Sequence, residues 1–199
     1  FSPGWGGPAL PETTQDLEER IGRLQEGPAV TAVDCDQALD HGWIEEIDPH
    51  PAYLERLGQL VDIDAIAKAG LRLAYNPLYG VGQGYLDRIL KEGGIEVTSV
   101  HSRLDPSFGG RPPEPSAENM KDFLALVKNE KKIALGLATD GDADRYGIVD
   151  GDGTFIEPNY ILPLLLDYLI RRRGVRKGVA RTVATSHFVD AVARHHGIE

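Results

Sequence analysis

From Leu71 onward, short apolar runs alternate with segments of helical periodicity. The runs "LRLAY", "IEVTSV" and "KIALGLA" are typical of strands, whereas "YLDRILKEGG" and "SAENMKDFLALVKNE" are typical of helices, with Ser116 as the expected cap of the second. This β-α-β-α-β order predicts an α/β fold with a mixed, largely parallel sheet layered with helices. The next segment, "YGIVDGDGTFIEP", predicts a hairpin with a DGDG turn.

Helical patterns flank this region on both sides. Leu17, Ile21 and Leu24 are spaced as on one helical face, and Gly27 follows them, so a helix is expected over residues 11–27. A second helix is expected over 49–70 and a third over about 159–173. "GVARTVAT" and "SHFVDAVARHHG" then resemble the start of another α/β unit. The Phe at position 1 and this interrupted pattern suggest a fragment of a longer protein.

Composition excludes several classes of protein. At 199 residues the chain suits one large domain or two small ones. The net charge of −10 argues against a general binder of nucleic acid or of anionic membranes. We find no signal peptide and no apolar run near the ~20 residues of a membrane helix. A single cysteine, Cys35, cannot form an internal disulfide, so a cytoplasmic location is expected.

Two acidic clusters follow the strand "KIALGLA". The first contains Asp140, Asp142 and Asp144, whose carboxylates can converge on a hard cation such as Mg²⁺ or Ca²⁺. Arg145 follows at once, and a guanidinium beside a cation suits a phosphoryl group. An EF-hand is excluded, because Arg145 and Gly151 occupy the places of its required Gly and Glu. A solvated surface loop remains the alternative.

The second cluster, Asp150 and Asp152 in "GIVDGDGT", matches the Asp-x-Asp-x-Thr opening of the haloacid dehalogenase phosphatases. That family needs a Lys and more acids well downstream, and only 45 residues follow Thr154. Asp-Gly is strong turn chemistry, so a hairpin turn is the favoured interpretation.

The first cluster in its setting, "TDGDADRYGIVD", resembles the magnesium loop of the α-D-phosphohexomutases, the phosphoglucomutase/phosphomannomutase group. Further segments resemble that family in the same order: "PALPETTQDLEERI", "NPLYGVGQGYLDRIL", "PEPSAENM" and "TVATSHFVDAVARHHG". By this resemblance residues 1–45 are the tail of domain I, 46–156 are the α/β/α domain II with the metal loop, and 157–199 begin a truncated α/β/α domain III.

The resemblance also implies an activity. Asp140, Asp142 and Asp144 would bind Mg²⁺, and Arg145 would contact the transferred phosphoryl group. The family interconverts hexose 1-phosphates and hexose 6-phosphates through a phosphoserine enzyme and a bisphosphate intermediate; glucose or mannose phosphate is the expected substrate. The family's Thr-Ala-Ser-His-Asn-Pro motif is missing from the 199 residues. The first alternative is therefore a metal-binding α/β module that is inactive on its own. A phosphatase is a less favoured alternative.

Other segments carry weaker signals. "GVGQG" could cradle a phosphate at a helix N-terminus, but a tight strand-to-helix turn is favoured. His187 begins a helix where α/β proteins place ligands, so it is a candidate for facing the sugar. His195 and His196 are expected to complement a helix dipole. "RRRGVRK" at 171–177 is expected to be a solvated helix end, although a phosphate role stays open.

Overall fold

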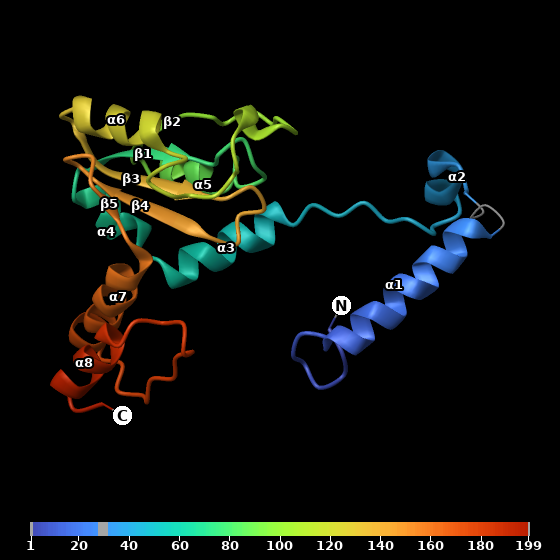
Figure 1. Cartoon of the computed structure of the whole chain (residues 1–199). Helices are drawn as coiled ribbons and strands as arrows, with labels where there is room; N and C mark the ends of the chain where they lie inside the picture. The colour runs from blue at the N-terminus through green and yellow to red at the C-terminus, as the bar shows by residue number, and fades with distance from the viewer. Residues whose placement is uncertain (1, 28–31, 199) are drawn as a thin grey trace. The chain divides into compact units, whose positions relative to one another are not determined.

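The computed structural model describes residues 2–27 and 32–198, which divide into two compact units, Phe1–Asp48 and Pro49–Glu199 (Figure 1). The first unit contains helices α1 (Pro11–Glu26) and α2 (Cys35–Asp40). Helix α1 lies where its periodicity predicts, and Gly27 follows it. Helix α2 was not predicted: its N-terminus depends on the Asp34 side chain, which accepts hydrogen bonds from two backbone amides.

The second unit is built on a five-stranded sheet in the order β2-β1-β3-β4-β5. Strands β1 (Arg72–Asn76), β2 (Glu96–Ser99) and β3 (Ile133–Thr139) are parallel, whereas β4 (Tyr146–Asp150) and β5 (Phe155–Ile156) continue the sheet in antiparallel pairings. The predicted mixed α/β sheet is therefore confirmed. The antiparallel part is the predicted hairpin together with its pairing to β3.

Helices cover both faces of the sheet. Helix α6 (Lys121–Asn129) packs on one face, where Phe123 and Val127 join the larger core cluster. Helices α4 (Ile63–Lys68) and α5 (Leu86–Glu92) pack on the other face around Leu73 and Leu90. Contact between α6 and β3 is close: a Cβ added at Gly136 would lie 2.9 Å from Val127 Cγ2. The small residue lets the helix approach the strand.

Two predicted helices have different bounds. Residues 49–70 form α3 (His50–Leu60) and α4 instead of one helix, because Val61 is extended and the Asp62 side chain caps the new helix at Ala65 N, 2.9 Å away. Helix α6 begins at Lys121, not near Ser116. The Ser116 hydroxyl accepts from Asn119 N, which closes a separate turn before the helix. A short 3₁₀ turn, η1 (Phe108–Gly110), lies in the preceding loop.

The C-terminal part of this unit contains α7 (Pro158–Arg173) and α8 (Phe188–His195). Both helices follow the sequence pattern. The run "GVARTVAT" (178–185) was expected to open another α/β unit, yet the described residues 174–187 form no strand, and Val183 is fully exposed there. A strand needs a hydrogen-bonded neighbour, and no strand of the described sheet pairs with this stretch. None of the described helices is long and apolar enough to cross a membrane.

Candidate functional site

The first acidic cluster forms the loop between β3 and β4. Thr139 and Tyr146 pair across the two strands, so residues 140–145 form the connection, called the Asp loop below. The Asp140 carboxylate accepts a hydrogen bond from Arg145 N at 2.9 Å, and Arg145 O accepts one from Asp140 N at 3.3 Å. Ala143 has a φ of 62°, which turns the chain back. These features make the Asp loop compact.

The loop brings the three aspartates together. One carboxylate oxygen each of Asp140, Asp142 and Asp144 lies within 4.8 Å of the others. Asp140 is buried at the strand end, whereas the other two are exposed. The neighbouring Asp142 carboxylate, burial and Asp140 together raise the pKa of Asp144 above its ordinary value of 3.8. This repulsion between carboxylates is what a divalent cation relieves, so the donor set fits Mg²⁺.

Arg145 lies beside the cluster. Its Nε is 3.8 Å from Asp140 Oδ2 and 3.7 Å from Asp144 Oδ1, while its Nη1 donates to Glu114 Oε1 at 2.9 Å. The side chain is 63% exposed, so part of the guanidinium faces solvent. The structure therefore places all four candidate residues in one loop, with donors and carboxylates side by side. Glu114, which lies outside the Asp loop, is a further residue of the cluster that sequence reasoning missed.

The "GVGQG" segment packs on the Asp loop. Val81 N donates to Gly141 O at 3.0 Å, and a Cβ at Gly80 would collide with the same carbonyl group. The Val81 amide is thus already used. The segment is the tight turn expected from its glycines, and it supports the Asp loop from one side. Beside it lies a cavity of about 480 Å³, lined by aromatic and apolar side chains and by Asp142.

The second acidic cluster is the turn of the β4–β5 hairpin. Asp150 Oδ1 accepts from Gly151 N at 2.7 Å, and Asp152 Oδ1 accepts from Thr154 N at 2.8 Å. Hydrogen bonds from the side chain and the backbone of Thr154 lower the pKa of Asp152. Among the described residues, the three aspartates of the Asp loop are the only acidic, histidine or cysteine group arranged to hold a metal.

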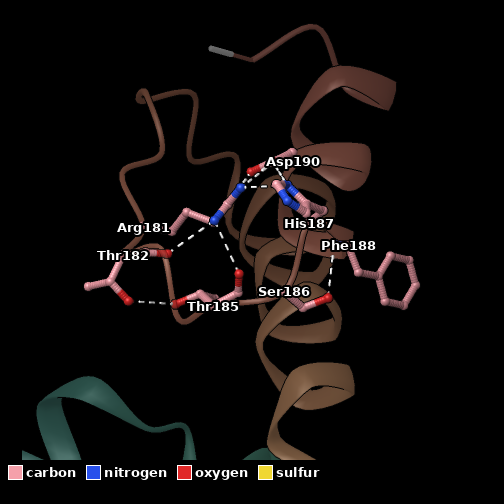
Figure 2. Close-up of polar contacts among 7 residues, drawn as sticks. All are labelled: Arg181, Thr182, Thr185, Ser186, His187, Phe188 and Asp190. Atoms are coloured by element: carbon pink, nitrogen blue, oxygen red, sulfur yellow. Dashed lines mark hydrogen bonds and ion pairs between the residues drawn. The ribbon is translucent and has the colours of Figure 1, made fainter.

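His187 belongs to a separate polar network at the start of α8 (Figure 2). Arg181 contacts both carboxylate oxygens of Asp190, at 2.5 and 2.6 Å, and also donates to the carbonyls of Thr182 and Thr185. His187 Nδ1 lies 2.9 Å from Asp190 Oδ2, and its side chain is 89% exposed. The network fixes the imidazole's orientation, and the role of His187 toward a sugar stays a prediction.

Two other sequence candidates make contacts that periodicity did not indicate. His196 follows the last turn of α8, as a dipole partner would, and its Nε2 lies 2.7 Å from Asp167 Oδ1 on α7. Arg173, the last residue of α7, donates to Leu60 O at the end of α3 at 2.9 Å. Both therefore connect elements within this unit.

The second unit is thus an α/β/α domain with three converging carboxylates at a strand end. Residues 51–153 match the sequence model of the phosphoglucomutase/phosphomannomutase α/β/α domain II. The chain belongs to the phosphoglucomutase/phosphomannomutase family.

Individual proteins of this family align with a larger part of the chain. A phosphoglucomutase of Komagataeibacter xylinus is 30% identical over 99% of this chain and 38% of its own length. A phosphoglucomutase/phosphomannomutase of Thermococcus kodakarensis is 35% identical over 78% of this chain and 34% of its own. A crystal structure of a family protein from Burkholderia thailandensis superposes with a TM-score of 0.59 at 28% identity, covering 78% of this chain and 33% of that one. The chain thus spans roughly a third of these relatives' lengths.

Proposed function

We propose that the protein containing this chain is a Mg²⁺-dependent phosphohexomutase that interconverts hexose 1-phosphates and hexose 6-phosphates, with glucose or mannose phosphate as substrate. The observation that carries the proposal is the Asp loop: three carboxylates within 4.8 Å and an arginine beside them, inside a domain of this family. The same proposal keeps the domain bounds of 1–45, 46–156 and 157–199 and a cytoplasmic location.

Each residue of the loop has a defined part in the proposal. Asp140, Asp142 and Asp144 would hold Mg²⁺ through hard oxygen ligands. The bound ion would supply electrostatic stabilisation of the negative charge that phosphoryl transfer spreads over oxygen atoms. Arg145 would donate hydrogen bonds to the same phosphoryl oxygens from its exposed side. Buried Asp140, which accepts a hydrogen bond from the Arg145 amide, would maintain the loop conformation during phosphoryl transfer.

The serine that carries the phosphoryl group is a further part of the proposal. The Thr-Ala-Ser-His-Asn-Pro motif is missing from this sequence, so the chain alone would hold the metal loop and transfer nothing. That is the second candidate function: a metal-binding module without catalysis. The two candidates differ in what the isolated chain does and agree on the Asp loop.

A mutase assay separates them. The 199-residue chain and the longest polypeptide that its gene encodes are each incubated with Mg²⁺, a hexose bisphosphate primer and glucose or mannose 1-phosphate. We expect the long polypeptide to produce the 6-phosphate and the chain alone to produce none. Activity of the isolated chain would disprove the need for an outside serine. A long polypeptide that converts neither sugar phosphate would disprove the proposed activity.

A further inference from the structure

The position of Arg145 depends on a residue outside the Asp loop. Among the described residues, the guanidinium hydrogen-bonds to one side chain, Glu114, through Nη1 and Oε1 at 2.9 Å. Its distances of 3.7 and 3.8 Å to Asp144 and Asp140 exceed hydrogen-bonding length. Glu114 therefore fixes the outer end of the guanidinium, while the aspartates only attract it.

Glu114 itself is held in place by its backbone. Its carbonyl accepts hydrogen bonds from Ser116 N at 2.9 Å and from Asn119 Nδ2 at 3.0 Å. It lies between Pro113 and Pro115, whose rings restrict the backbone dihedrals. These contacts hold the Glu114 backbone, while its side chain is 58% exposed and is oriented by the contact with Arg145.

The same segment contacts the chain on both sides of Arg145, at Gly141 in the Asp loop and at Gly147 in β4. Gly141 N donates to Pro113 O at 3.0 Å. A Cβ added at Gly141 would lie 3.0 Å from the Pro113 ring, and one added at Gly147 would lie 2.9 Å from Pro115. The two prolines thus pack directly on two glycines, which sets the distance between Glu114 and Arg145.

An arginine beside three carboxylates is drawn toward the space that a cation would need. The geometry points to Glu114 as a positioning residue that holds the Arg145 guanidinium at the edge of the aspartate cluster. This leaves the space between the carboxylates to a divalent ion, and it orients the remaining N–H groups for a phosphoryl oxygen. The inference rests on the proposed function for the metal, but the contact between Glu114 and Arg145 can be tested without one.

The first test follows the side chain of Arg145 by NMR in the metal-free chain labelled with ¹⁵N-arginine, with Arg145→Gln used to assign the Nε–H signal. We expect a resolved Nε–H signal that moves toward the position of a solvated arginine in Glu114→Ala and returns part of the way in Glu114→Gln, which keeps an acceptor oxygen. Glu118→Ala, an exposed acid on the same segment, is the control and should leave the signal unchanged. An unchanged signal in Glu114→Ala would overturn the inference.

The second test is a double-mutant cycle read by Mn²⁺ binding in the chain. Glu114→Ala should weaken Mn²⁺ binding ~3-fold, within the range of an exposed ion pair, since the freed guanidinium then competes with the ion. In the Arg145→Gln background the same change should have much less effect, because no guanidinium remains to compete. Equal effects in both backgrounds would mean that Glu114 acts by its charge alone, which overturns the inference. If the wild-type chain binds no Mn²⁺, the proposed metal site is wrong, and the NMR result still decides the role of Glu114.

Discussion

At the residue scale, the aspartates of the Asp loop have different structural roles, although they look alike in sequence. Asp140 is buried and hydrogen-bonded to the Arg145 amide, so it shapes the loop as well as offering an oxygen. Asp142 and Asp144 are exposed, and Asp142 is the main reason that the pKa of Asp144 is raised. Asp142 is therefore the position where a charge can be removed with the least effect on loop structure.

We expect Asp142→Asn to weaken Mg²⁺ or Mn²⁺ binding while the chain stays folded. The attraction between a divalent ion and one carboxylate ~4 Å away is about 2 kcal/mol even in water, which corresponds to ~30-fold in affinity. Calorimetry or Mn²⁺ relaxation titration measures this change. Asp152→Asn is the matched control, since Asp152 belongs to the hairpin turn and bonds Thr154 N. A similar loss in Asp152→Asn would mean that the wrong cluster was chosen.

The four residues of the loop could be predicted because they are consecutive or nearly so, and their convergence needs only a tight connection. Glu114 could not, since it lies 31 positions from Arg145 and meets it only when two loops pack together. The run "RPPEP" shows that the segment is stiff, yet nothing in it indicates which cation Glu114 contacts. Such long-range pairs depend on the sheet order, which local periodicity does not determine.

At the element scale, sequence patterns predicted strands better than helix limits. β1, β2 and β3 begin and end within a residue or two of their predicted runs. Burial on both faces accounts for the continuous apolar runs of β1 and β3. The edge strand β2 instead alternates between exposed and half-buried residues. The break between α3 and α4 was missed, because apolar periodicity continues through it while Asp62 caps a new helix. In residues 174–187 the sequence pattern instead suggested regular structure that does not form. β-branched residues favour a strand only where a partner strand exists.

The connection between α7, the 174–187 segment and α8 depends on two ionised aspartates. Hydrogen bonds from Arg181 and then His187 hold the pKa of Asp190 well below its ordinary value of 3.8. The hydrogen bond with His196 lowers the pKa of Asp167 from the same ordinary value. A carboxyl with a lowered folded-state pKa stabilises the fold above its unfolded pKa, and this contribution is lost as the pH falls below that value.

We therefore expect the stability advantage of wild type over Asp190→Asn to shrink as the pH falls below 3.8. Asp167→Asn should follow the same course with a smaller effect. Urea unfolding of α8, followed by amide hydrogen exchange at a series of pH values, measures the difference. Asp64→Asn, an exposed acid in the first turn of α4, is a control for general acid effects. An advantage that stays constant down to pH 3 would contradict the role given to Asp190.

At the scale of the whole molecule, the second unit contains everything on which the proposals rest. All residues of both core clusters lie between Ile63 and Phe155, and the Asp loop, Glu114 and the turn at residues 80–82 lie in the same unit. Helix α1 of the first unit has no buried residue, and its Ile21 and Leu24 are exposed. The family match also falls inside the second unit, at residues 51–153.

Residues 49–199 expressed alone should therefore fold and bind Mn²⁺ as the whole chain does. We expect the urea midpoint of unfolding and the Mn²⁺ affinity to agree with those of the 199-residue chain within error, because no residue of either core cluster and no ligand candidate is removed. A shorter piece, residues 71–199, is the matched comparison: it lacks α4, whose Ile63 and Ile66 pack against the core around Leu73, and it should unfold at lower urea. If residues 49–199 lose both stability and Mn²⁺ binding, the first unit supplies contacts on which the Asp loop depends.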